Sequence, residues 1–429
     1  MTLPRHAPIL PLSSPPKASW RRLWFLYFLF TAGMQLANGV AHTLLLTRGG
    51  VDMLPATFAA RGLFVLLASA AYVPLARHID ARRMLALING LIALFLLGTY
   101  ALLQSGLSVS YPALYVLTET SETIFKIHFG VVLLACLPAD EILSRLPLVY
   151  SGARAGAVVG GLALTFARHV GLTHLIFGTI ILQIMATAFS FGGLPHQSPP
   201  PPKEKALPRS WRDLFRETRS SSSSLLFVTI ALATTLLVAT RHALRYLYSA
   251  RVAAAFGEFD LAATAGLFFA IASLIAGLIQ ALVTPRLLTG VGLTTLNLAY
   301  ATSIPFTFAL TWVAPPLVGA ALARLIESEL KMAIKTPVSN LLYGGLPASQ
   351  RPTARAFILG AVVPLATGAA SLALGLAPFG TRAWGFVAGL ALVGVTIAQN
   401  RVYRRALGVQ KDENARQAAE NVLTEGSEP

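Results

Sequence analysis

Apolar runs of about 20 residues recur from one end of this chain to the other, with short polar segments between them. A run of this length can cross a bilayer as a helix, whereas a soluble fold would mix short strand and helix patterns. The sequence therefore predicts an all-α polytopic membrane protein with about twelve transmembrane helices. We expect them near residues 22–46, 55–76, 84–104, 111–137, 147–168, 172–193, 225–250, 260–283, 291–313, 316–337, 355–377 and 383–402.

One long polar segment divides this series of apolar runs. Residues 194–222 contain four consecutive prolines, several Lys and Arg residues and a serine run, which is typical of a linker. We therefore expect an N-terminal six-helix bundle in residues 1–193 and a C-terminal one in 223–402. A polar tail is expected in 403–429.

The two halves also resemble each other. At an offset of about 209 residues, Leu137-Pro138-Ala139 corresponds to Leu346-Pro347-Ala348, and Lys126 falls on Lys335. Halves of six spans enter the membrane in the same direction, so such a duplication is a parallel repeat about an axis normal to the membrane. The sequence thus predicts two pseudo-symmetric bundles.

Composition narrows the class further. Of 429 residues, 55% are hydrophobic and 12% are charged, which is too apolar for an ordinary soluble protein. The net charge of +16 would suggest a nucleic-acid partner in a soluble protein. Here the Lys and Arg residues gather in alternate short loops, so we expect a lipid bilayer and no nucleic acid as partner. The positive-inside rule predicts both termini and the linker in the cytoplasm, with the chain in the inner (plasma) membrane.

The sequence offers no signature of a metal, cofactor or enzyme site. Its single cysteine, Cys136, excludes a disulfide framework and a Cys-based metal site. No phosphate-cradling loop, His-Glu-x-x-His motif or nucleophile elbow occurs. We therefore expect no cofactor and no enzymatic activity, and we expect the protein to act as a monomer.

Four of the predicted helices carry a polar stripe. Members of each stripe recur every three or four residues, so each stripe lies on one helix face. Such faces normally point into a bundle interior or a wet cavity, which predicts a polar path between the halves. The stripes are Thr31, Gln35, Asn38 and His42; Glu119, Glu122 and Lys126; Arg241, Arg245 and Tyr248; and Arg324, Glu327, Lys331 and Lys335.

Cations outnumber acids in these stripes, and an unpaired buried cation is costly, so the surplus favours an anionic substrate. The expected substrate-binding residues are Lys126, Arg241, Arg245, Arg324, Lys331 and Lys335. The expected coupling or gating residues are Glu119, Glu122, Glu327, His42 and Asp80. A structural role is the competing interpretation, because Glu327 and Lys331 form a favourable i, i+4 pair.

Two resemblances support a transporter. The segment Arg77-His78-Ile79-Asp80-Ala81-Arg82-Arg83 resembles the loop between the second and third helices of major facilitator transporters, although the expected leading Gly is absent. In those proteins an acid and basic residues latch the cytoplasmic side. The twelve spans, the central basic linker and the duplication are similar to that fold as well.

The second resemblance is narrower. Residues 331–358 resemble the bacterial and plastid ATP/ADP translocase family, which carries a basic residue, a Pro, an acid and a Tyr there, then a basic residue before Phe-Ile. The matching residues are Lys335, Pro337, Tyr343, Arg355, Phe357 and Ile358. The family's acid after the Pro is Asn340 here, and Leu359 replaces the acid after Phe-Ile. The resemblance implies a divergent member that moves a nucleotide or phosphorylated metabolite by alternating access.

Two other functions fit the same sequence. A proton-coupled exporter of a hydrophobic or cationic compound would use Glu119, Glu122 and His42 as working residues. A non-transporting membrane scaffold would leave the charged stripes without a role in flux.

Overall fold

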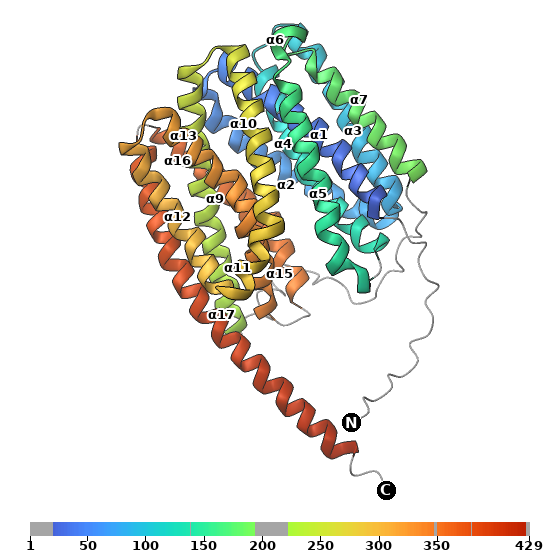
Figure 1. Ribbon diagram of the computed structural model, residues 1–429, viewed down its shortest axis with the longest axis vertical. Coiled ribbons are helices and arrows are strands. Elements are labelled where there is room, and N and C mark those ends of the chain that lie inside the picture. Colours follow the sequence, from blue (N-terminus) through green and yellow to red (C-terminus); the bar gives the residue numbers. More distant parts are fainter. Residues whose placement is uncertain (1–19, 138, 194–221, 347–349, 379, 426–429) are drawn as a thin grey trace.

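The protein is a bundle of long helices (Figure 1), described by a computed structural model over residues 20–137, 139–193, 222–346, 350–378 and 380–425. The expected linker at 194–222 lies outside the described residues except for Ser222, and so do the last four residues.

The N-terminal bundle consists of six long helices and short connecting turns. They are α1 (Trp20–Leu44) with η1 (Leu45–Gly49) and η2 (Val51–Met53), α2 (Leu54–His78), α3 (Ala81–Gln104), α4 (Ser110–Cys136), α5 (Ala139–Leu164), the short α6 (Ala167–Val170) and α7 (Leu175–Gly193). These ranges match the first six predicted spans to within a few residues, apart from an earlier start of α5.

The C-terminal bundle repeats this arrangement with more irregular helices. It comprises α9 (Ser222–Ala255); α10 (Glu258–Leu278), η3 (Ile279–Val283) and α11 (Thr284–Gly290); α12 (Leu293–Val313); α13 (Pro316–Arg324), η4 (Leu325–Lys335), α14 (Thr336–Leu342) and η5 (Tyr343–Gly345); α15 (Arg351–Phe357), η6 (Ile358–Val362) and α16 (Val363–Leu376); and α17 (Thr381–Glu425). Residues 403–425, within the predicted polar tail, continue α17 as helix.

Hydropathy alone identifies eight of these elements. The described helices that are long and apolar enough to cross a membrane cover Trp20–Gly49, Val51–Ala76, Ala81–Gln104, Leu175–Gly192, Leu225–Ala255, Glu258–Leu278, Ile358–Leu376 and Thr381–Gly408. The remaining long elements are α4, α5, α12 and the rod formed by α13, η4 and α14. Both α4 and η4 carry charged stripes, which lower their mean hydropathy without shortening them.

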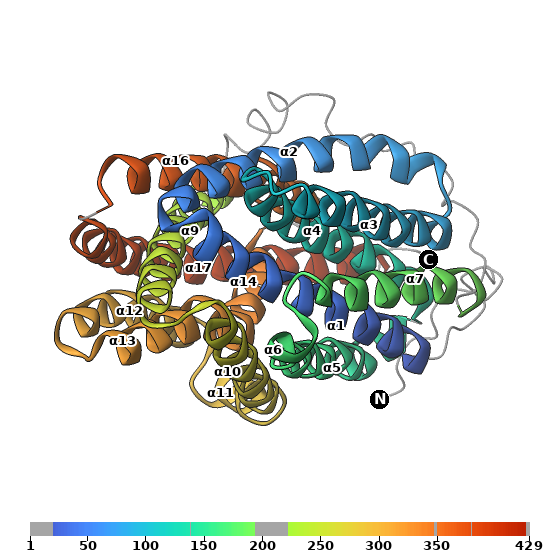
Figure 2. The same ribbon diagram turned by 90° about the horizontal axis from the view of Figure 1, so that it is seen from above.

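The two bundles meet along two edges. Helix α2 packs on α16 at one edge, and α5 packs on α10 at the other (Figure 2). The second span therefore contacts the eleventh, and the fifth contacts the eighth. Rotation about a two-fold axis that exchanges the halves converts one of these contacts into the other. The predicted all-α fold of two pseudo-symmetric bundles is thus confirmed.

Glycines allow the closest helix approaches. Gly152, Gly156 and Gly160 face α1, where a Cβ on any of them would overlap a backbone carbonyl of that helix. Their four-residue spacing predicts such packing. Between the bundles, a Cβ on Gly161 of α5 would lie 2.7 Å from the carbonyl oxygen of Gly266 of α10. Contact between these two helices thus depends on the absence of side chains.

The interface is sealed at the end far from the chain termini. Side chains of α1 and α4 form one buried apolar cluster with Tyr248, Val252 and Leu261 from the C-terminal bundle. Those three residues lie near the end of α9 and the start of α10. Arg48 and Glu258 pair across the same region, with two contacts of 2.7 Å, and Arg168 lies 2.5 Å from Asp260.

Candidate functional site

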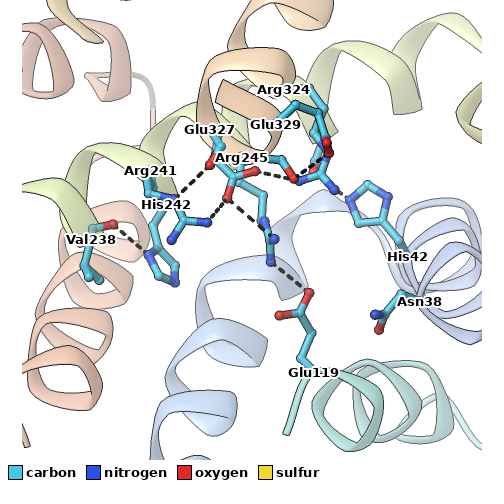
Figure 3. Close-up of polar contacts among 12 residues, drawn as sticks. Asn38, His42, Glu119, Val238, Arg241, His242, Arg245, Arg324, Glu327 and Glu329 are labelled. Atoms are coloured by element: carbon cyan, nitrogen blue, oxygen red, sulfur yellow. Dashed lines mark hydrogen bonds and ion pairs between the residues drawn. The ribbon is translucent and has the colours of Figure 1, made fainter. Parts of the chain in front are cut away.

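A network of charged side chains occupies the interface between the bundles (Figure 3). At its centre is Glu327 of η4, which is only 1% exposed. Its Oε1 lies 2.6 Å from Arg241 Nη2 and 3.6 Å from Arg245 Nη2. Its Oε2 lies 2.6 Å from Arg324 Nη1. One buried carboxylate therefore holds three guanidinium groups.

Glu119 of α4 is the second carboxylate of the network. Its Oε1 lies 3.0 Å from Arg245 Nη1, and its Oε2 lies 3.1 Å from Arg61 Nε. Arg245 also donates to the hydroxyl of Tyr115 at 2.8 Å. Arg61 and Glu119 belong to the N-terminal bundle and Arg245 to the C-terminal one, so this carboxylate joins the bundles. Two of the predicted acids and three of the predicted cations are thus brought together.

The tenth span is locally a π-helix over the eleven residues Leu325–Lys335. A π-helix closes its hydrogen bonds to the fifth residue instead of the fourth, and it is frequent at functional sites. Lys335, the last residue of η4, donates to Asn297 Oδ1 of the same bundle at 2.6 Å. Its ammonium group is thus engaged by an amide and not by the carboxylate of Glu327, and its expected role in substrate binding stays a prediction.

Lys331 is the cation of the network whose positive charge is least balanced by direct contacts. It is partly buried, and no ion pair or side-chain hydrogen bond of its ammonium group occurs among the described residues. It lies within electrostatic range of Arg241 and Glu327 of its own bundle, and of Lys126 and Arg61 of the other. The predicted i, i+4 pairing with Glu327 does not form as a direct contact, because that carboxylate is occupied by arginines.

The remaining predicted residues lie around this centre or away from it. Glu122 pairs with Lys126 one turn along α4 and accepts from Asn38 Nδ2 at 2.9 Å. His42 Nε2 lies 2.9 Å from Ser249 Oγ across the interface. Asp80 is outside the network: it caps the start of α3, where it accepts from the backbone N–H of Arg83 at 3.4 Å.

Sequence reasoning missed two contributors. Arg61 and Arg154 are single cations in apolar spans with no partner on their own helix, and that was their only signal. Arg154 of α5 lies 3.1 Å from Glu329 and donates to Gln280 Oε1 at 3.3 Å, so it also joins the bundles.

The interface carries more cations than acids. The cations are Arg61, Lys126, Arg154, Arg241, Arg245, Arg324 and Lys331, and the acids are Glu119, Glu122, Glu327 and Glu329. Three positive charges therefore have no carboxylate of their own in this part of the described chain. Such an arrangement is suited to holding an anion.

Comparison with known proteins identifies the fold of this chain but assigns the chain to no family. Neither a protein-family model nor a curated protein matches this sequence. Solved structures do match it. The nucleoside transporter NupG (D323A mutant) superposes with a TM-score of 0.65 and 13% identity, over 90% of this chain and 99% of that one. A peptide transporter, POT, in complex with sulfate gives 0.67 and 14%, over 90% and 94%.

A bacterial homologue of the iron transporter ferroportin, in an inward-facing state, gives 0.59 and 13%, over 90% and 98%. The fold is therefore that of the major facilitator transporters. At these identities the likeness establishes the fold only, and the narrower resemblance to ATP/ADP translocases finds no support in the family comparison.

Proposed function

We propose that this protein is a secondary active transporter of an organic anion, working by alternating access. The observation that carries the proposal is the cationic surplus between the bundles, in which Lys331 has no carboxylate within ion-pair distance among the described residues. Membrane-embedded charges are costly, and they are retained mainly where they serve a substrate path. An anion bound there would supply the missing negative charge.

A mechanism follows from the two central carboxylates. Glu119 is held by Arg61 of one bundle and Arg245 of the other. An incoming anion would compete with Glu119 and Glu327 for these guanidinium groups. Loss of the Glu119 bridge would then loosen the bundles from each other, since one of the contacts that cross the interface is exchanged for contacts to the substrate.

Access to this site differs between its two ends. The far end is closed by apolar packing and by the pairs of Arg48 and Arg168. Towards the termini, the side chain of Lys126 is 43% exposed, whereas that of Glu327 is 2% exposed. With the termini in the cytoplasm, as the positive-inside rule predicts, this corresponds to a state that opens inward.

A nucleotide or phosphorylated metabolite is the cargo we favour. Its phosphate oxygens accept charge-assisted hydrogen bonds in the paired geometry that guanidinium groups offer. The resemblance of residues 331–358 to nucleotide translocases points to the same class. Lys335 is left out of this substrate site, because its ammonium group donates to Asn297.

Uptake into proteoliposomes tests the proposal. Labelled nucleotides, sugar phosphates and inorganic phosphate are offered one at a time, with and without internal counter-substrate. We expect at least one to accumulate, and Lys331→Gln to reduce its uptake at least tenfold. Arg404→Gln is the matched control: it also removes one positive charge, but Arg404 is exposed and donates to Thr294 Oγ1 at 2.8 Å. If no anion is transported, or both variants behave alike, the proposal fails.

A further inference from the structure

A small cavity lies inside the C-terminal bundle, between α9, α14 and α17. Its volume is about 30 Å³, and its polar lining consists of Lys335, Gln399, Thr234, Ser339 and Tyr343, with aliphatic side chains completing the wall. One water needs about 10–15 Å³ measured in this way, so the cavity has room for one or two water-sized particles. A metabolite does not fit.

Lys335 brings a positive charge to this cavity without a counter-charge from the protein. The residue is 5% exposed. Its ammonium donates to Asn297 Oδ1 at 2.6 Å, and that partner is a neutral amide. No carboxylate of the described residues lies within ion-pair distance of it. A buried ammonium in this situation requires a counter-ion to remain charged.

A chain of amides fixes which groups face the cavity. Asn297 uses both hydrogens of Nδ2, donating to Gln399 Oε1 and to Asn400 Oδ1, each at 2.9 Å. Asn400 in turn donates to the backbone oxygen of Thr294 at 2.7 Å. The oxygen of Gln399 is therefore an acceptor within this chain, which leaves its NH₂ group as a donor where Gln399 lines the cavity.

The residues that line the cavity carry an ammonium, an amide and three hydroxyl groups, and none of them is an acid. Hydroxyl groups can donate as well as accept, so every polar group at this wall is able to donate to the same occupant. A lining rich in donors, with one net positive charge, favours a negative ion over a cation. The volume restricts that ion to a small one.

We propose that this cavity binds one small monovalent anion of halide type, such as chloride, as the counter-ion of Lys335. The ion would connect α9, α14 and α17 at the point where Asn297 already ties α12 to α17. The inference goes beyond the proposed transport function and does not depend on it, because the site lies inside one bundle and not between the two.

Thermal unfolding of the full-length protein in detergent tests the site. Sodium chloride and sodium bromide are titrated against sodium gluconate at matched ionic strength. We expect Tm to rise in both halides to a plateau, since a ligand of the native state stabilises it by mass action. Equal Tm values in halide and gluconate overturn the proposal.

Two variants test whether the rise in Tm with halide arises at Lys335. Lys335→Met should abolish the difference between halide and gluconate, whereas Arg404→Met, which removes one positive charge outside both proposed anion sites, should retain it. A halide effect that persists in Lys335→Met refutes the assignment. If Lys335→Met does not fold, crystals of the unaltered protein grown in bromide decide the matter. An anomalous peak beside Lys335 Nζ supports the site, and an empty cavity at saturating bromide contradicts it.

Discussion

We expect the stability of the protein to depend more on the charge of Glu327 than on any other single charge. In Glu327→Gln the side-chain volume is kept and the charge is lost. Its oxygens lie 2.6 Å from both Arg241 and Arg324, and 3.6 Å from Arg245. All three guanidinium groups are at most 20% exposed, so water replaces little of the lost charge. Breaking a buried pair costs about 3–5 kcal/mol, and we expect a loss of that size in the free energy of unfolding.

Glu122→Gln provides the matched control. Glu122 also pairs with a cation, Lys126, but their side chains are 28% and 43% exposed. Pairs of this kind contribute about 0–1 kcal/mol, so this variant should unfold close to the unaltered protein. The assay is equilibrium unfolding in detergent by denaturant, followed by circular dichroism.

The same unfolding experiment can be repeated in the presence of the transported anion. If Glu327 balances cations that also bind substrate, the anion should stabilise Glu327→Gln more than the unaltered protein, since it supplies the missing charge. A loss below about 1 kcal/mol in Glu327→Gln, or a loss equal to that of Glu122→Gln, would refute the view that Glu327 organises the network.

Two further predictions concern the sealed end of the interface. Arg48→Ala removes an ion pair whose side chains are 43% and 19% exposed, so stability should change by less than about 1 kcal/mol. The bundles should nevertheless part more often there, measured as faster thiol labelling of a cysteine introduced at Val252; an unchanged rate contradicts this. Gly161→Val places a side chain against the carbonyl oxygen of Gly266, 2.7 Å from the new Cβ. We expect a folded protein whose flux is lost because this end cannot close; normal flux would show that the close approach is dispensable.

Local patterns in the sequence determined much of this architecture. A membrane span needs only about 20 apolar residues in succession, and that property is visible without any tertiary contact. The duplication likewise appears as matched positions such as Lys126 and Lys335. Charged residues spaced by three or four in apolar helices pointed to the interface, because lipid disfavours them. Arg241, Arg245 and Glu327 were found in this way.

Tertiary structure decided which charges meet. Arg245 and Glu119 are 126 positions apart, and no spacing rule relates residues on different helices of separate bundles. Arg61 and Arg154 acquire partners only when the bundles pack. Lys335 likewise acquires its partner only in the packed bundle, where its ammonium group donates to Asn297, 38 positions away on α12. Helix periodicity predicts which residues of one helix share a face, whereas the partner of each charge depends on which helices pack against that face.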